Sequence, residues 1–271
     1  MIDVLHAEFH KFKGMFRRYY VDSAAEIVSY LVLFIGLFYT IFQTAANIEA
    51  MLFQLLIGIF IWYVGINSIA VFTFILQEEM QLGTLEQIYL TKTSLTKMLF
   101  GRAFSTFIFD AIGGIVLALL TFTVIITIST EPITVAGLFQ SVDWLFFAVV
   151  IALTMVGIYG FSFMLAGLSI VFKRISAITV LLNYAFLFFT GITLAEGSLP
   201  FVIDLIAKQL PITYGVINLN AMSQSQSSLA NFASTEFVIL VAHSISYMII
   251  GLLLFHLMLN VARKNGNLGH Y

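Results

Sequence analysis

Three polar side chains lie inside long apolar stretches and are the first candidates for chemistry: Asp110, Asn183 and His243. Burying an ionisable group in lipid costs several kcal/mol, so such groups usually face a cavity or a partner. Asp110 could therefore be a proton or substrate site. It could also be a structural residue reached by water, because it lies only about eight residues beyond Arg102. The same two interpretations stay open for Asn183 and His243.

Other patterns argue against catalysis by this chain. The sequence has no cysteine, no P-loop and no Gly-x-Ser-x-Gly elbow, so it offers no reactive thiol, no nucleotide site of the usual kind and no serine nucleophile. His6 and His10 share a helix face but lack a third ligand, which is typical of histidines at headgroup level. We therefore expect no catalytic residue, metal site or cofactor in this chain.

The composition indicates a protein whose solvent is lipid. Of 271 residues, 61% are hydrophobic and 10% are charged, and the mean hydropathy is +1.03. A soluble domain carries roughly 25% charged residues, because its surface must be polar in water. The net charge of −2, without a basic stripe, also argues against a nucleic-acid partner.

Six apolar runs are each long enough to cross a bilayer as a helix, which needs about 20 residues. Spans must satisfy their own backbone polar groups, and no barrel-like alternation is visible, so we expect helices. The predicted fold is an all-α membrane protein in which residues 1–271 form one transmembrane domain. The six predicted spans are Ala24–Ala46, Met51–Leu76, Ala103–Ile128, Trp144–Phe172, Ile175–Ala195 and Phe237–Val261.

Basic residues orient these spans. With six spans, both termini lie on one side, and that side holds all 12 Lys and Arg residues except Lys208. Basic residues favour the cytoplasmic side of a membrane. We therefore expect a multi-pass protein of the cytoplasmic membrane, with both termini in the cytoplasm.

The N-terminal segment, residues 1–22, is predicted to be an amphipathic helix on the cytoplasmic leaflet. Phe9, Phe12 and Phe16 fall at helical spacing. Arg17 and Arg18 lie away from them and would be attracted to anionic lipid headgroups. Membrane lipids are therefore expected partners of this segment.

A polar stretch, residues 77–99, separates the second and third predicted spans. From Gln77 to Arg102 the sequence reads QEEMQLGTLEQIYLTKTSLTKMLFGR. It is longer than a simple turn requires and carries a helical pattern of its own. We therefore predict a cytoplasmic helix that docks onto a partner.

The outer segment, residues 196–235, has a different character. Pro200 and Pro211 break an apolar stretch into pieces that are each too short to span the bilayer. We predict a re-entrant hairpin, able to act as a gate, followed by a polar outer loop. A stretch that lies flat on the membrane fits the same pattern.

Taken together, these features resemble the membrane-spanning permease subunit of ABC-2 type transporters, which are mostly bacterial exporters of drugs, lipids, glycans and peptides. Two stretches carry the resemblance: EEMQLGTLEQIYLTKTSLTKMLFGR, and LP followed by QLPITYGV with its Pro-x-x-Tyr element. The sequence departs from the family at Lys92, where proline is common, and at Leu210, where asparagine is common. An arginine often follows the hairpin, where this chain reads INLNAM.

The resemblance implies partners and site residues. The partners would be two copies of a P-loop ATPase subunit, which binds ATP and Mg, and a second permease copy or a related permease. The outer gate would include Pro200, Pro211 and Tyr214. The coupling contacts with the ATPase would be made by Glu78, Glu79, Gly83, Thr84, Leu85 and Glu86, and, at a second contact, by Lys173 and Arg174.

The function expected from the sequence is that of a permease in an ATP-driven exporter. Its substrate would be amphiphilic, lipid-like, a peptide or a drug, and it would work by alternating access. The alternative is an ion-coupled secondary transporter or channel that uses Asp110 and His243, but such a carrier needs no cytoplasmic coupling helix and usually shows inverted repeats. A membrane enzyme would need clustered catalytic residues, which the sequence lacks.

Overall fold

The computed structural model of the chain is α-helical in all the regular elements that it describes. The confirmed part of the predicted fold is therefore its all-α class. The described residues are 2–42, 48–84, 87, 90, 94–128, 142–172, 175–189, 200–222 and 231–264.

Within these ranges, five helices are sufficiently long and apolar to cross a membrane. Two of them, α3 and α5, contain 34 residues each. At about 1.5 Å per residue they are ~50 Å long and must extend beyond a hydrocarbon core of about 30 Å. The five helices are α2 (Tyr20–Phe42), α3 (Ile48–Gln81), α5 (Leu95–Ile128), α7 (Trp144–Phe172) and α12 (Thr235–Lys264).

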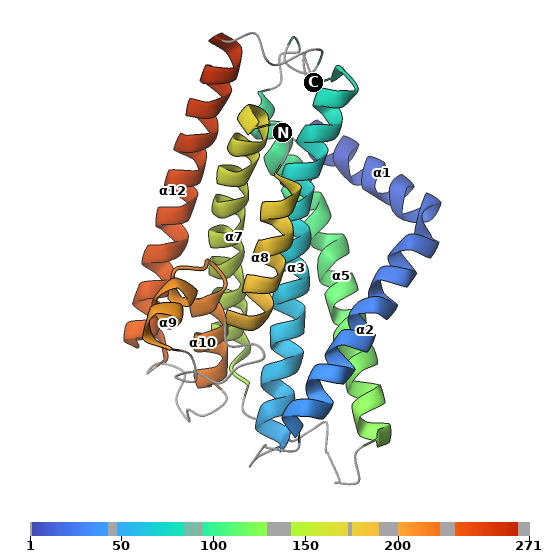
Figure 1. Cartoon of the computed structure of the whole chain (residues 1–271), viewed down its shortest axis with the longest axis vertical. Helices are drawn as coiled ribbons and strands as arrows, with labels where there is room; N and C mark the ends of the chain where they lie inside the picture. Colours follow the sequence, from blue (N-terminus) through green and yellow to red (C-terminus); the bar gives the residue numbers. More distant parts are fainter. Residues whose placement is uncertain are drawn as a thin grey trace.

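The predicted fifth span is described only in part. α8 (Ser176–Phe189) has 14 residues, and its length of about 21 Å is less than a hydrocarbon core of ~30 Å. Residues 190–195 of the predicted span lie outside the described ranges. α8 runs beside α3 (Figure 1), where the indole Nε1 of Trp62 donates to the Asn183 carbonyl at 3.4 Å. The sixth span therefore stays a prediction.

The helices alternate in direction along the bundle. α3, α7 and α12 run one way, and α2, α5 and α8 run the other way (Figure 1). The N-terminal helix α1 (Ile2–Arg18) lies at the same end as the last turns of α3 and α12. The predicted interfacial helix and the start of the predicted coupling segment therefore meet at one end of the molecule.

Close contact between α7 and α12 holds the centre of the bundle together. A Cβ on Gly251 would overlap the carbonyl of Gly160, so only glycine lets the two backbones approach this closely. The ring of Phe163 on α7 packs against Phe72 of α3 and Phe255 of α12, with centroids 4.9 and 5.7 Å apart. These contacts join α3, α7 and α12 into one body.

Two short helices lie at the end opposite α1 (Figure 1). α9 (Phe201–Lys208) follows Pro200, and α10 (Thr213–Met222) follows Pro211. The Thr213 hydroxyl donates to the Ala207 carbonyl at 2.6 Å and closes the turn between them. The prolines thus separate two helices, each too short to span a bilayer. Residues 196–199 and 223–230 of the predicted outer segment lie outside the described ranges.

The predicted topology can be tested with single cysteines, because the sequence contains none. Leu82, Gln209 and Lys264 are all exposed. We expect Leu82→Cys and Lys264→Cys to react with a membrane-impermeant maleimide from the cytoplasmic side, and Gln209→Cys to react only from the outer side. Labelling of Gln209→Cys from the cytoplasmic side would contradict six spans and indicate that α8 does not cross.

Candidate functional site

The predicted coupling segment, residues 77–99, begins within the last turns of α3 and ends within the first turns of α5. The chain turns at Gly83, whose φ of 67° lies in the left-handed region that glycine adopts without strain. The N–H groups of Leu82 and Gly83 donate to the carbonyls of Glu78 and Met80, at 2.9 and 3.2 Å. Gly83 therefore has a structural role: it stops α3 and leaves Glu78 and Glu79 near its end.

A buried arginine from α5 reaches the same region. Only 2% of the Arg102 side chain is exposed. Its Nε donates to Oε2 of Glu8 at 2.9 Å, and its Nη2 donates to Oε1 of Glu8 at 3.4 Å. Such a two-point contact fixes orientation as well as distance. Arg102 therefore ties α5 to the middle of α1.

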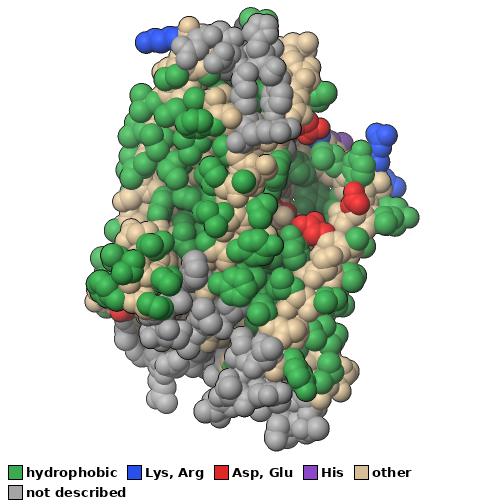
Figure 2. Space-filling view, in the orientation of Figure 1, with side chains coloured by type: hydrophobic (Ala, Val, Ile, Leu, Met, Phe, Trp, Pro, Cys, Tyr) green, Lys and Arg blue, Asp and Glu red, His purple; other side chains and the backbone are tan. Residues whose placement is uncertain are grey.

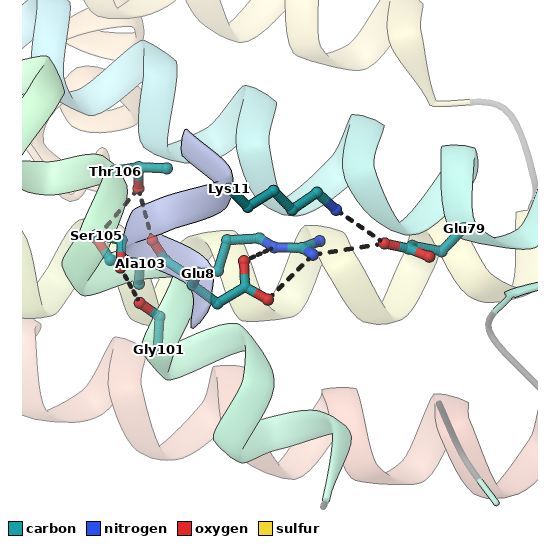
Figure 3. A network of polar contacts seen from close by, with 8 residues as sticks. Glu8, Lys11, Glu79, Gly101, Ala103, Ser105 and Thr106 are labelled. Carbon is teal, nitrogen blue, oxygen red and sulfur yellow. Dashed lines mark hydrogen bonds and ion pairs between the residues drawn. The ribbon is translucent and has the colours of Figure 1, made fainter. Parts of the chain in front are cut away.

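Glu79 of α3 joins the same group of charges. Its Oε1 accepts from Nη2 of Arg102 at 3.5 Å and from Nζ of Lys11 at 3.4 Å, and its Oε2 accepts from the Thr84 hydroxyl. Figure 3 shows Glu8 and Lys11 of α1 meeting Glu79 of α3. Two acids and two bases balance, which reduces the cost of taking them out of water. We call Glu8, Lys11, Glu79 and Arg102 the ion network.

Aromatic contacts hold α1 against α5 beside this network. The rings of Phe9, Phe12 and Phe16 surround Phe109, with centroids 5.3, 6.5 and 6.1 Å away. The predicted lipid-facing side of α1 is thus used partly for packing within the chain, although Phe16 stays 52% exposed. Arg17 and Arg18, in the last turn, are exposed.

Glu78 lies in different surroundings from its neighbour Glu79. It is exposed, together with Gln81, Leu82 and Gly83, and Leu82 is 67% exposed. We call these four residues the α3 tip. An acid beside an exposed leucine can bind a partner through both charge and apolar contact. The remaining predicted coupling residues, Leu85, Glu86, Lys173 and Arg174, lie outside the described ranges.

The structure does not bring the three predicted pathway residues together. Asp110 lies on α5 near α2 and α3, and Asn183 lies on α8. The ring of His243 on α12 contacts Tyr214 and Tyr247, with centroids 5.0 and 6.1 Å away. Each of the three residues has one buried side-chain atom with no hydrogen-bond partner in the described part of the chain: Oδ1 of Asn183, Oδ2 of Asp110 and Nδ1 of His243. No hydrogen bond between these three side chains is present among the described residues.

Sequence reasoning missed Glu8 and Lys11, and it placed Arg102 only at the start of the third span. The available signal was that Arg102 is followed directly by an apolar stretch. An arginine in such a position needs a carboxylate partner when it is buried. The sequence contains many acids, and only the fold selects Glu8, which is 94 residues away.

Comparison of the chain with protein-family models and with curated protein sequences found no significant match. The function is therefore inferred from the geometry of the site. Near the end of α3, Glu78 is exposed, whereas Glu79 contacts Lys11 and Arg102. A force applied to the α3 tip would reach α1 and α5 together, because Glu79 and Arg102 connect the three helices.

Proposed function

We propose that this chain is the permease subunit of an ATP-driven ABC exporter. Two permeases, either two copies or one copy with a related chain, would form the pathway. Two P-loop ATPase subunits, which bind ATP and Mg, would dock on the cytoplasmic face. The complex would move an amphiphilic, lipid-like, peptide or drug substrate across a bacterial cytoplasmic membrane by alternating access, and both termini of this chain would be cytoplasmic.

One observation carries this proposal: an exposed tip on α3 is connected through polar contacts to two other helices. Glu78 is exposed, whereas Glu79 contacts Lys11 of α1 and Arg102 of α5. A partner that moves the tip would therefore move α1, α3 and α5 as one unit. Energy from a separate ATPase needs such a connection, because coupling requires a structural element that both sites affect.

The opposite end of the molecule supports the same proposal. There, α9 and α10 lie at the end opposite α1 (Figure 1), which in this proposal is the outer end of the pathway. Tyr214 of α10 contacts His243 of α12, and the Tyr247 hydroxyl donates to the Gln209 carbonyl. The predicted gate residue Tyr214 is thus in contact with α12, and motion of α12 would displace α9 and α10.

An ion-coupled carrier is the second candidate, because Asp110 has a buried oxygen with no hydrogen-bond partner in the ranges that the structure describes. In that case Asp110 and His243 would act together. The two residues have separate contacts, with α2 and α3 for Asp110 and with Tyr214 and Tyr247 for His243. This separation favours the exporter over a proton relay that uses both.

Co-purification tests the proposed function. The tagged full-length chain is extracted from its native membrane in mild detergent, and its partners are identified by mass spectrometry. We expect a P-loop ATPase at about one copy per chain, and none with an unrelated membrane protein that carries the same tag. A monodisperse chain that never retains an ATPase would overturn the proposal and favour the ion-coupled carrier.

A further inference from the structure

Acidic and aromatic side chains meet between α2 and the neighbouring helices. Figure 2 shows a hollow between the corner formed by α1 and α2 and the neighbouring helices, with acidic side chains at its margin. α2 packs loosely: 11% of its most apolar 18-residue stretch is buried, compared with 72% of the corresponding stretch of α3. The hollow therefore opens toward the side where lipid would surround the protein.

Two carboxylates face this junction. Glu26 of α2 lies near Asp110 of α5, and Oδ2 of Asp110 is buried with no hydrogen-bond partner among the residues that the structure describes. Within the described ranges, neither residue forms an ion pair with a basic side chain. The base two turns away on α5, Arg102, is already held by the ion network. Negative charge in an apolar setting is costly unless a cation compensates it.

Aromatic rings lie around the same carboxylates. The Tyr30 hydroxyl donates to Oε1 of Glu26 at 3.1 Å, and its ring contacts Trp62 and Tyr63 edge-on, with centroids 4.9 and 5.9 Å away. Tyr63 also lies near both Glu26 and Asp110. Aromatic rings attract cations through their faces, and aromatic cages recognise quaternary ammonium ligands.

A glycine makes room for this arrangement. Gly113 lies one turn beyond Asp110 on α5, and a Cβ there would lie 2.9 Å from the Tyr63 hydroxyl oxygen. A larger residue at this position would push Tyr63 away from Asp110. Close packing of α3 on α5 is thus what places an aromatic ring beside the buried carboxylate.

We propose that Glu26 and Asp110, with the ring of Tyr30, bind a lipophilic organic cation. The carboxylates would neutralise its charge, and the Tyr30 ring would contact its apolar body. Trp62 and Tyr63, which are 1% and 7% exposed, would support Tyr30 from behind. A hard metal ion instead prefers six or more oxygen ligands, which two carboxylates among aromatic rings do not supply. The role of this cation as the transported substrate rests on the proposed exporter function, whereas its binding requires only this chain.

Equilibrium binding of tetraphenylphosphonium to the full chain in phosphatidylcholine nanodiscs tests this site. Empty nanodiscs give the background from lipid partitioning. We expect saturable binding that Asp110→Asn and Glu26→Gln each weaken roughly tenfold or more, because each removes one charge partner of a desolvated cation. Glu236→Gln, an exposed acid in the first turn of α12, should bind as the unmodified chain does. Tetraphenylborate, which has the same shape and the opposite charge, should not compete.

Three results would overturn the site. The first is binding no greater than in empty nanodiscs, and the second is binding by both acid variants as tight as that of the unmodified chain. The third is competition by tetraphenylborate. Each variant must elute as a single peak. If Asp110→Asn does not fold, Glu26→Gln decides, because Glu26 is exposed on loosely packed α2. Binding by a chain that retains no ATPase would keep the site and reject the exporter, so the two proposals fail separately.

Discussion

Arg102→Ala is expected to destabilise the chain by about 3–5 kcal/mol, the usual cost of removing one partner from a buried ion pair. Glu8 would lose both of its contacts with the guanidinium, and Glu79 would lose one. Both carboxylates are largely buried beside the arginine, at 11% and 12% exposed, so little water is present to replace it. Loss of folded protein during titration with SDS, followed by tryptophan fluorescence, measures the effect.

A nearby exposed base provides the control for this substitution. Lys97 lies in the first turn of α5 and is exposed, so Lys97→Ala should change stability by less than about 0.5 kcal/mol. A double-mutant cycle with Glu8→Gln should show that Arg102 and Glu8 are coupled. Equal stability of Arg102→Ala and the unmodified chain would show that the ion network does not hold α1 in place.

Charge reversal at Glu78 should have its largest effect on the partner rather than on the fold. We expect Glu78→Lys to reduce the ATPase that co-purifies at least tenfold, which corresponds to about 1.4 kcal/mol, because like charges at an interface repel. Glu78 is exposed at the α3 tip, so the stability of the chain should hardly change. The two readouts are the ATPase retained per chain and the SDS titration.

The adjacent residue serves as the matched comparison. Glu79→Lys should lower stability as well as ATPase retention, because its carboxylate contacts Lys11, Arg102 and the Thr84 hydroxyl. From the sequence alone, the two glutamates form one pair with one role. If Glu78→Lys and Glu79→Lys unfold the chain equally, the α3 tip is not a separate contact surface.

Helical spans follow from the sequence because hydropathy and length are local properties. Apolar runs long enough to cross lipid predict α2, α3, α5, α7 and α12, and the structure contains helices of sufficient length there. Their ends are less predictable. α3 continues past the predicted end at Leu76 to Gln81, since polar residues with high helix propensity extend a helix until Gly83 stops it.

The candidate site was only partly predictable, because its contacts depend on packing between distant segments. Helical spacing places Phe9, Phe12 and Phe16 on one face of α1, but it does not say whether lipid or Phe109 covers that face. The pairing of Arg102 with Glu8 likewise depends on packing between segments that are distant in the sequence. Hydropathy identifies Asp110 as unusual, whereas its neighbours on α2 and α3 emerge only from the fold.

Crosslinking from the α3 tip tests the central claim most directly. A photo-crosslinking amino acid is placed at exposed Leu82, and a second chain carries it at exposed Gln209 at the opposite end. After irradiation in native membranes, we predict that a P-loop ATPase is crosslinked at position 82 and not at position 209. Absence of an ATPase at position 82, or the same crosslinked protein at both positions, would contradict the proposal that the end of α3 couples this chain to ATP hydrolysis.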